Sequence, residues 1–594
     1  MNSLAGPAPL MTGSLVLRVV LAWALVCVMA MIAAWSAIPQ LRFNDPDDAL
    51  RLVQVRGLIA GQGWFDLTLH GVDAPRGVLM HWSRLVDVPI ALVILLLRPL
   101  VGTAGAEQAA IVIVPALTLL CGMLLTGRLA RQFGSDSAAL VASLLWPLSF
   151  ATMTQFAPLR IDHHGWQIVA LLAAANALFA RRARLGGWLI GASLAGGMAI
   201  SLELLPYAGL FAGVLALRWL ADREARSGLV AMLDGLALTS LALFALTRGT
   251  DLAPWCDIAS PGYLAGFVLA AVLVRLIALR RLAPVVVAGL LGISALLCVG
   301  LFLAVAPQCT RGPFAALDPL VYEYWYKNVL EGLPVWRQPL ANAAQMAVPP
   351  LFGLIAAAFL WRSAGSDGQR RNWREFALLL AGFFLIAVVV ARAGAAACAL
   401  ATVPTACALR PLLARVQDLR RPVLRVLALA GVLLALIPGM AVVAAQKAAP
   451  VFGAKSAAPV STASLQQVCG MPGSVAVLDS LPRSTLFTPL DIGPWVLLRS
   501  HHGVIATGHH RASAPMRDVI SAFLAQPDEA HTLIRKHGAA YVLTCADLTE
   551  AGVYRDMSGT GLMARLLAGK PPGWLQPVPL PGDAGTLRVW KVVG

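Results

Sequence analysis

Three short polar segments of this chain carry side chains that can hold a cation. Asn44-Asp45-Pro46-Asp47-Asp48 places three carboxylates just after the first apolar stretch, residues 19–38. Met80-His81-Trp82 adds an imidazole, and Asp162-His163-His164 adds a carboxylate and two imidazoles at the edge of a later apolar stretch. A carboxylate beside lipid is costly unless it binds a cation or a proton. Carboxylates and imidazoles from three separate loops therefore predict a divalent metal site.

The elements that position these segments are membrane helices. The chain is 58% hydrophobic and only 13% charged, and apolar stretches of about 18 or more residues recur through its first three quarters. About 13 spans are expected, from residues 17–38 to residues 423–445, with one of them at residues 135–157. Helices satisfy their own backbone polar groups in lipid, so the predicted fold is α-helical and polytopic. The net charge of +16 does not indicate nucleic-acid binding, because the basic residues are scattered in short loops.

The basic loops also predict which side of the membrane the acidic segments face. Arginine clusters near residues 128, 181, 223, 280, 371 and 420 share one side if residues 86–100 do not cross the membrane. That stretch is apolar, is only about 15 residues long and ends in Arg98-Pro99, which predicts an interfacial or re-entrant helix. The external loops are then residues 39–106, with non-crossing helices, and residues 307–342. The first span is expected to be retained and not cleaved as a signal peptide.

The last quarter of the chain has a different amino-acid composition. Residues 446–594 have mixed polarity and many Gly and Pro turns, which predicts an α/β domain after a transmembrane domain at residues 1–445. Strands are expected at residues 474–478, 495–498, 504–507 and 541–544, and a helix at residues 528–537. The domain is expected on the extracytoplasmic, periplasmic side of the inner (plasma) membrane. Cys256, Cys309, Cys469 and Cys545 lie outside the spans on that oxidising side, which allows a Cys469–Cys545 bridge.

Each candidate ligand also has a plain structural interpretation. Asp47 and Asp48 suit the first turn of an amphipathic helix, where carboxylates favour the helix N-terminus. Asp45 fits this interpretation less well, because capping does not need three carboxylates. His163 alone suits an interfacial histidine, whereas Asp162 and His164 together favour a metal site. A lone loop histidine such as His81 is usually solvated. It is a candidate metal ligand only because the other candidate ligands are present.

Taken together, the Asn-Asp-Pro at 44–46, the His-Trp at 81–82 and the Asp-His-His at 162–164 resemble a known family. It is the catalytic subunit of oligosaccharyltransferase, of archaeal or bacterial type, in the GT-C superfamily of membrane glycosyltransferases. The resemblance implies the GT-C fold, a catalytic carboxylate on Asp45, and a divalent cation, Mn or Mg. The metal ligands that it implies are Asp45, His81, Asp162 and His164.

The resemblance extends to two later parts of the chain. It implies that Glu331, in a mobile external loop, helps to hold the acceptor and the metal, with Glu323 as the second match. It also implies that Arg392 binds the donor phosphate. The family reads its acceptor with a Trp-Trp-Asp-Tyr-Gly motif, and the nearest match here is Pro489-Leu490-Asp491-Ile492-Gly493. Asp491 and Gly493 are therefore the expected acceptor-binding residues, although the tryptophan pair is absent.

The predicted activity is the transfer of a sugar or glycan from a polyprenyl-phosphate or polyprenyl-diphosphate donor, with inversion, on the extracytoplasmic face. Without the tryptophan pair, a lipid, polysaccharide or other glycan acceptor is at least as favoured as a protein. His501, His502, His509 and His510 are expected to be surface or rim residues, with His509 or His510 in the acceptor groove as the less favoured alternative. Two alternatives stay open: a transporter or flippase, and a non-catalytic subunit of glycan export. A transporter predicts charges near the membrane midplane and inverted repeats, whereas here the acids stand at span ends.

Overall fold

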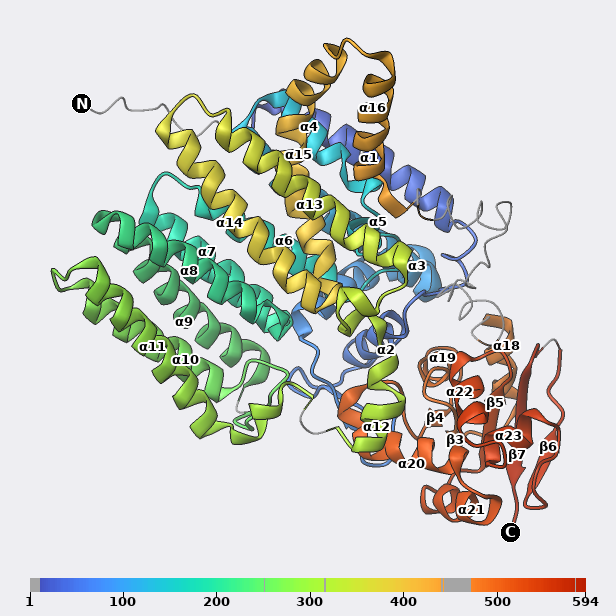
Figure 1. The fold of residues 1–594 in the computed structure, drawn as a ribbon. Helices are drawn as coiled ribbons and strands as arrows, with labels where there is room; N and C mark the ends of the chain where they lie inside the picture. The colour runs from blue at the N-terminus through green and yellow to red at the C-terminus, as the bar shows by residue number, and fades with distance from the viewer. Residues whose placement is uncertain are drawn as a thin grey trace.

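The computed structural model describes residues 11–249, 251–314, 317–439, 442, 469, 472–582 and 584–594. A body of long helices accounts for the first three quarters of the chain, and a smaller domain of helices around one sheet follows it (Figure 1). Nine helices in these described ranges are long and apolar enough to cross a membrane. The chain is therefore a multi-pass membrane protein with a C-terminal α/β domain, and the total of about 13 spans stays a prediction.

The helical body contains fifteen α-helices and the short α5, with two short strands in the loop that precedes α3. The helices are α1 (Gly13–Ala34), α2 (Pro46–Ile59), α3 (Arg84–Phe133), α4 (Asp136–Leu144), α5 (Phe150–Met153), α6 (His164–Leu178), α7 (Ala183–Ile200), α8 (Leu205–Ala221), α9 (Arg226–Arg248), α10 (Pro261–Ala278), α11 (Pro284–Val305), α12 (Pro319–Tyr324), α13 (Leu340–Arg362), α14 (Asp367–Val389), α15 (Gly394–Gln417) and α16 (Pro422–Leu436). Strands β1 (Thr68–Leu69) and β2 (Val78–Leu79) pair antiparallel.

One predicted span is wrong. Residues 135–157 do not form a single helix, because the 3-10 turn η1 (Trp146–Leu148) separates α4 from α5. Pro147 within this turn has no N–H to donate to a continuing helix. The Trp146 ring packs 5.0 Å from the Phe156 ring and is fully buried, so core packing fixes the turn.

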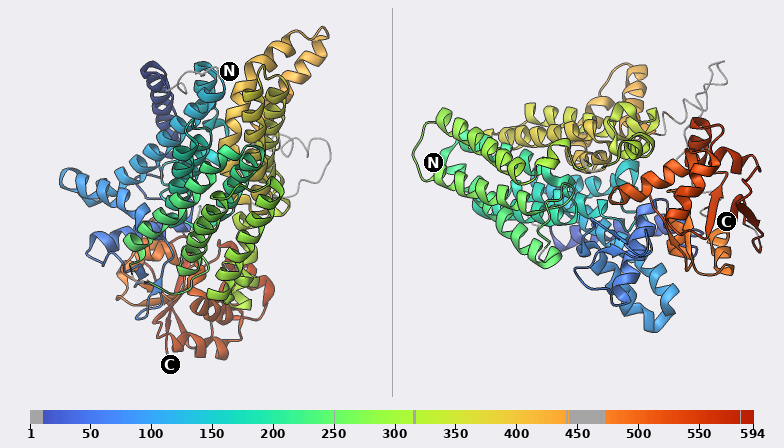
Figure 2. Two further views of the ribbon diagram at one scale, coloured as in Figure 1. Left: turned by 90° about the vertical axis from the view of Figure 1, so that its left-hand side faces the viewer. Right: turned by 90° about the horizontal axis from the view of Figure 1, so that it is seen from below.

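Helix α3 bends sharply at Gly102. Its backbone there has φ 73° and ψ 173°, a conformation that favours glycine. The arm before the bend exposes Leu92, Leu96 and Leu100, as expected for a helix that lies against lipid. In the left-hand view of Figure 2, this light-blue part of the chain projects to the side of the long helices. The break is at Gly102 and not at Arg98-Pro99. The interfacial position expected for residues 86–100 stays a prediction.

We expect Arg131→Cys and Arg184→Cys to react with a membrane-impermeant thiol reagent only after the cytoplasmic face is opened. The reason is that an arm that stays on one side of the membrane keeps both arginines on the cytoplasmic side. Labelling of intact cells or oriented vesicles checks this. Arg76→Cys, which replaces a highly exposed residue of the β1–β2 loop, is the external control. Reaction of Arg131→Cys from outside would show that the arm crosses.

The C-terminal domain is a mixed five-stranded sheet with helices around it. Its strand order is β4-β3-β5-β7-β6, with β3 parallel to β4 and β5, and β7 antiparallel to β5 and β6. The elements are α18 (Pro472–Ala476), β3 (Thr485–Phe487), α19 (Gly493–Arg499), β4 (Gly503–Val504), α20 (Ser513–Leu524), α21 (Pro527–Lys536), β5 (Tyr541–Cys545), α22 (Thr549–Met557), α23 (Leu562–Leu567), β6 (Leu575–Val578) and β7 (Leu587–Val592).

Two of the four predicted strands are wrong, and a third, at residues 504–507, overlaps β4 only at Val504. Residues 474–478 lie in α18 and the 3-10 turn η11 (Val477–Ser480), and residues 495–498 lie in α19. A short apolar run does not distinguish a buried helix turn from a strand. Pro494 stands in the first turn of α19, a position that suits proline in helices. The predicted strand at residues 541–544 is confirmed by β5, and the predicted helix at residues 528–537 by α21.

The loop before α3 joins the helical body to the C-terminal domain. The Val504 N–H donates to the Gly71 carbonyl at 2.8 Å, and the Asp73 N–H donates to the Val504 carbonyl at 2.9 Å. This pairing adds a short strand-like segment to the β4 edge of the sheet. Arg56 of α2 also donates to the Leu498 carbonyl of α19 at 2.7 Å. Helix α2, which starts directly after Asp45, therefore lies where the two parts meet (Figure 1).

Both pairs of loop cysteines form disulfides. Cys256 is bonded to Cys309, and Cys469 is bonded to Cys545, as the sequence allowed. Structural disulfides persist in oxidising compartments, which agrees with an extracytoplasmic position for these loops. The predicted domain boundary between residues 445 and 446 falls outside the described residues.

Candidate active site

Asp45 stands at the N-terminus of α2, as expected. Its Oδ1 accepts a hydrogen bond from the Asp47 N–H at 2.9 Å, and its Oδ2 pairs with the Arg160 guanidinium. Pro46 occupies the first helical position, where its missing N–H costs nothing. The Asp45 side chain keeps 26% of its surface exposed, so its carboxylate remains accessible at the helix mouth.

Asp48 does not have the role expected from its place in the first turn. Its carboxylate leaves the helix and accepts hydrogen bonds from the Ile161 and Asp162 N–H groups at 2.8 and 2.9 Å. Its Oδ2 also lies 3.0 Å from Nη1 of Arg160, and the residue is only 1% exposed. Asp48 therefore fixes the backbone of the second acidic segment to α2, which the interpretation as a plain helix charge did not predict.

Asp162, His163 and His164 form a compact group of candidate ligands. Their ligand atoms all lie within 4.8 Å of one another. Nδ1 of His163 is 2.5 Å from Oδ1 of Asp162, and Nε2 of His164 is 3.4 Å from Oδ2. Burial alone would raise the pKa of Asp162, but His163, His164 and Arg51 together hold it well below its usual range.

Two details of this group suit a bound cation. Oδ2 of Asp162 is buried and has no hydrogen-bond partner among the described residues. Gln167 donates through Nε2 to Glu203, so its Oε1 accepts from Nδ1–H of His164 at 3.1 Å. This arrangement selects the tautomer of His164 whose Nε2 carries a free lone pair facing Asp162. A carboxylate oxygen and an imidazole nitrogen with open valence fit a divalent metal.

A buried network of charged and polar side chains from α2 and α3 contacts Asp162. Arg51 of α2 donates to Oδ1 of Asp162 at 3.3 Å and to Asp87 of α3 at 3.1 Å. Arg84 and Gln54 complete the shell of Asp87, at 3.1 and 2.6 Å. The Arg51, Asp87 and Arg84 side chains are all 0% exposed. Removal of one partner from such a network leaves an uncompensated buried charge, so the network holds Asp162 rigidly.

A chain of polar contacts leads from His164 to Arg392. Nε2 of Gln167 donates to Glu203 at 3.0 Å, and Nη1 of Arg392 donates to the other oxygen of Glu203 at 2.6 Å. Nη2 of Arg392 is 3.3 Å from Glu331. Glu331 lies in the 3-10 turn η6 (Leu330–Gly332). A hydrogen bond from the Ala391 N–H to the Leu333 carbonyl holds the end of this turn beside Arg392. The structure thus joins the predicted phosphate-binding arginine, the predicted loop glutamate and the candidate metal group.

Glu323, the second match for the loop glutamate, lies apart from this chain of contacts. Its carboxylate pairs with Lys327 at 2.6 Å, and both side chains are more than half exposed. Exposed pairs of this kind contribute about 0–1 kcal/mol to stability and indicate no site. Between the two glutamates, the geometry favours Glu331.

His81 lies in a different group from Asp162 and His164. Its Nδ1 is 2.9 Å from Nε2 of His509, and its ring centroid is 4.8 Å from that of His510. The Trp82 ring separates these three histidines from Arg51. The Arg51 guanidinium stacks over the Trp82 ring at 4.4 Å. Of the four predicted metal ligands, only Asp162 and His164 share a group whose ligand atoms are within 4.8 Å.

Asp491 and Gly493 lie at the turn between β3 and α19. Glu550 of α22 accepts the Leu490 and Asp491 N–H groups, both at 2.8 Å, and so holds this turn. A Cβ on Gly493 would approach the Ala506 carbonyl oxygen to 2.8 Å, which explains the glycine. The contacts of the turn position α19 against α2, and a role in acceptor binding stays a prediction.

No protein-family model and no curated protein matches the chain. Among solved structures, it is similar to the archaeal oligosaccharyltransferase AglB from Archaeoglobus fulgidus in complex with an inhibitory peptide and a dolichol-phosphate. That match has a TM-score of 0.67 at 16% identity, over 97% of this chain and 74% of the archaeal chain. The chain has the GT-C fold. Structures of the same archaeal enzyme tethered to an acceptor peptide, and in complex with Zn and sulfate, match at TM-scores of 0.61 and 0.55. Their identities are 16% and 14%, over 98% and 96% of this chain and 74% and 73% of theirs.

Several residues of this candidate site were missed by sequence reasoning. Arg51 and Gln54 look like solvated positions of an amphipathic helix, and only the tertiary fold buries them against Asp87. Glu203 carried a usable signal, because a lone carboxylate between two apolar spans indicates a functional position. Arg160 carried a weaker signal, as a cation two residues before the acidic segment.

Proposed function

We propose that this chain is a membrane glycosyltransferase that moves a sugar or glycan from a polyprenyl-linked donor to an acceptor. The observation that carries the proposal is the continuous line of contacts from Asp162 through His164, Gln167 and Glu203 to Arg392 and Glu331. This line connects the candidate metal ligands Asp162 and His164 to Arg392, the candidate phosphate-binding residue. All three lie near the ends of apolar helices. Such an arrangement suits a lipid-linked substrate whose charged head must meet the protein at the membrane surface.

The ligands of the structural neighbour support the donor and the cofactor. The archaeal enzyme was solved with a dolichol-phosphate and with an acceptor peptide, and also with Zn and sulfate. For this chain we propose a polyprenyl-phosphate or polyprenyl-diphosphate donor and a divalent cation, Mn or Mg. The cation would be held by Asp162 and His164, with Asp45 completing the set from α2. The acceptor is a glycan, lipid or protein.

The chemistry follows from the charge that develops during transfer. The sugar leaves a phosphate or diphosphate, so negative charge grows on the leaving oxygen, and a divalent cation supplies Lewis-acid stabilisation of that charge. Arg392 binds the phosphate through its guanidinium, which Glu203 holds in place. Asp45 orients the acceptor nucleophile and withdraws its proton. Attack from the face opposite the phosphate inverts the anomeric centre.

We place the reaction on the extracytoplasmic face of the inner membrane. The two disulfides and the distribution of the basic loops support this side. The direct test uses purified protein, a labelled polyprenyl-linked sugar and membrane glycans as acceptors. Transfer of label to the acceptor is the expected result. Binding of the donor without transfer to any acceptor would instead favour a non-catalytic subunit.

We expect Arg392→Gln to raise the donor KM by about 10- to 100-fold, because a charge-assisted hydrogen bond contributes about 1.5–3 kcal/mol. Arg392→Lys keeps the charge but not the planar fork, so it should give an intermediate value. Initial-rate kinetics at varied donor concentration checks this. Arg218→Gln, which breaks a comparable pair with Glu375 at 2.6 Å, is the control for loss of a partly buried arginine. Equal donor KM values in both variants would contradict the assignment.

A further inference from the structure

A row of aromatic rings runs from the external loop before α13 toward the candidate active site. The ring centroids of Tyr322 and Tyr326 are 5.0 Å apart, and those of Tyr326 and Phe314 are 4.9 Å apart. The Phe314 ring lies 5.1 Å from the His510 ring, which lies 4.8 Å from the His81 ring. Each ring packs against the next one, and these five rings are called the aromatic row below.

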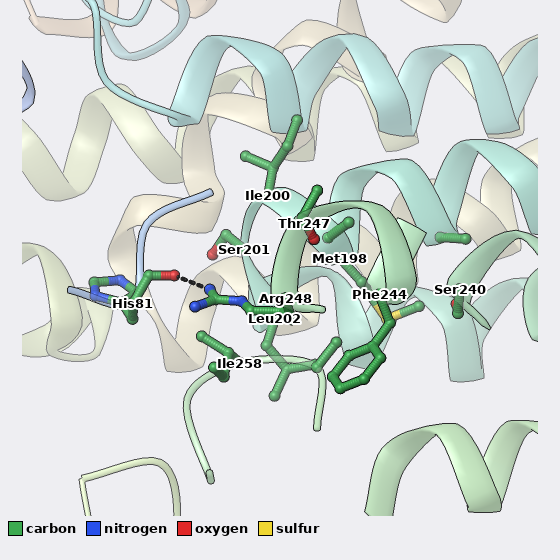
Figure 3. Close-up of a pocket in the computed structure, with 13 residues that line it drawn as sticks. His81, Met198, Ile200, Ser201, Leu202, Ser240, Phe244, Thr247, Arg248 and Ile258 are labelled. Carbon is green, nitrogen blue, oxygen red and sulfur yellow. Dashed lines mark hydrogen bonds between the residues drawn. The ribbon is translucent and has the colours of Figure 1, made fainter. Parts of the chain in front are cut away.

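Polar contacts fix the inner end of the aromatic row. Nη2 of Arg248 donates to the His81 carbonyl at 2.5 Å, as Figure 3 shows. Nε2 of His510 lies 2.7 Å from Oδ2 of Asp257. The two histidines of the row are therefore held by groups outside it.

The aromatic row ends beside the candidate metal ligands. The ring centroids of His81 and Trp82 are 5.9 Å apart, and the Arg51 guanidinium stacks over Trp82 at 4.4 Å. Arg51 in turn donates to Asp162 at 3.3 Å. The row therefore connects the external surface to the residues around Asp162.

The outer rings also lie near the candidate phosphate-binding residue. Burial and the neighbouring Tyr322 raise the pKa of the Tyr326 phenol, whereas Arg392 lowers it. An effect of this kind requires the guanidinium and the phenol to be close to each other, because water and salt screen distant charges. A ligand that contacts Tyr326 is therefore close to the proposed donor.

The two tyrosines of the row are open to a ligand. Tyr322 has 45% of its surface exposed, and Tyr326 is partly buried. Among the described residues, neither phenol hydroxyl has a hydrogen-bond partner. Tyr263 differs, because its hydroxyl donates to the Cys256 carbonyl at 2.9 Å. The outer end of the row thus combines an apolar ring surface with two free hydroxyls.

This combination suits a sugar better than a lipid or a peptide. A sugar ring has a face of C–H groups that packs on an aromatic ring, and its hydroxyls need donors and acceptors at the ring edge. An acyl chain makes no use of the free hydroxyls. The turn at residues 489–493 offers little to a peptide backbone, because Glu550 already binds the Leu490 and Asp491 N–H groups.

We propose that the acceptor is a saccharide and that one of its sugar rings packs on Tyr322 and Tyr326. The proposal rests on the proposed function for the transfer step and adds the chemical class of the acceptor. An acceptor hydroxyl forms the new glycosidic C–O bond while the C–O bond to the donor phosphate breaks. The proton of that hydroxyl passes to Asp45.

The test measures acceptor binding without donor or divalent cation. Purified full-length protein in detergent is exposed to an array of soluble oligosaccharides from cell-envelope glycans, and the sugars that bind are titrated. We expect Tyr322→Leu to weaken binding by about 3- to 10-fold, as for loss of one aromatic stacking contact. Tyr322→Phe keeps the ring and should lie between the wild type and Tyr322→Leu. Trp336→Leu, which removes an exposed ring of the same loop outside the row, is the matched control and should bind as the wild type does.

The outcomes separate the acceptor classes. Absence of binding to every sugar of the array, or equal affinity of the wild type and Tyr322→Leu, would overturn the proposal. Tyr322-dependent binding of Asn-x-Ser/Thr peptides in place of sugars would identify a protein acceptor. Tyr322-dependent binding of phosphatidylglycerol vesicles in place of sugars would identify a membrane anchor.

Failure of the proposed function gives a different result. Tyr322-dependent sugar binding by a protein that transfers no sugar would keep the saccharide site and refute the transferase. Transfer to a glycan with the same acceptor KM in the wild type and Tyr322→Leu would keep the transferase and overturn this site. Thermal unfolding midpoints of both Tyr322 variants verify that they are folded.

Discussion

Asp45→Ala is expected to lower glycosyl transfer by about 10²–10⁴-fold, the range for loss of a positioned acid–base group. The carboxylate stands at the mouth of α2 with a quarter of its side chain exposed. Its removal costs one helix cap, about 1 kcal/mol, and one of the two carboxylate partners of Arg160, which keeps Asp48 at 3.0 Å. The fall should therefore appear in kcat and not in the yield of folded protein. Initial rates with a labelled polyprenyl-linked donor check this.

The matched control for Asp45→Ala is Asp222→Ala. Asp222 also caps a helical turn, by accepting the Glu224 N–H at 3.0 Å, but it lies in the connection between α8 and α9 and far along the chain from the acidic segments. Both variants lose the same kind of cap, and only Asp45→Ala also loses a partner of Arg160, so a difference in rate belongs to the surroundings of Asp45. Full transfer by Asp45→Ala, with a metal still required, would move the catalytic carboxylate elsewhere.

Asp48→Ala is expected to remove activity and to destabilise the fold as well. Three donors lose their acceptor, namely the Ile161 and Asp162 N–H groups and the Arg160 guanidinium. A broken buried ion pair costs about 3–5 kcal/mol. A shift of the Asp162 backbone by about 1 Å would lower turnover by about 10²-fold, because catalytic groups tolerate little misplacement. Kinetics and thermal unfolding of the same preparation measure the two effects.

The conservative variant Asp48→Asn distinguishes positioning from plain stability. Its amide oxygen can still accept both backbone N–H groups, which Oδ1 alone accepts in the wild type, but the amide nitrogen cannot accept from Arg160, so the second acidic segment should stay partly in place. We expect a stability between those of the wild type and Asp48→Ala. We also expect the variant to need a higher concentration of Mn or Mg for activity than the wild type, because Asp162 is less firmly positioned. An unchanged metal requirement and full turnover in Asp48→Ala would show that Asp48 does not position Asp162.

The helical fold and part of the site could be predicted because both depend on local signals. Apolar stretches of span length identify membrane helices directly. Asp45, Asp162 and His164 stood out because carboxylates and imidazoles are costly at the edge of apolar segments. The bend in α3 is a different case, because the sequence predicted a short interfacial helix at residues 86–100 and not the break at Gly102.

Other features depend on contacts between distant segments and could not be read locally. Asp48 sits one residue from Asp47, yet only tertiary structure reveals that it binds the backbone more than a hundred residues away. His81 was grouped with Asp162 by residue type, whereas the fold turns its ring to His509 in the C-terminal domain. Residues 495–498 were predicted as a strand because a four-residue apolar run has no readable period.

Transfer of label from a polyprenyl-linked sugar by purified protein, before and after removal of divalent cations, tests the central claim most directly. The account predicts transfer by the wild type, loss of transfer with a chelator and recovery on addition of Mn or Mg. Asp162→Ala should stay inactive at every metal concentration, because the carboxylate at the centre of the candidate ligand group is gone. Equal transfer by the wild type and Asp162→Ala, with or without the chelator, would contradict it.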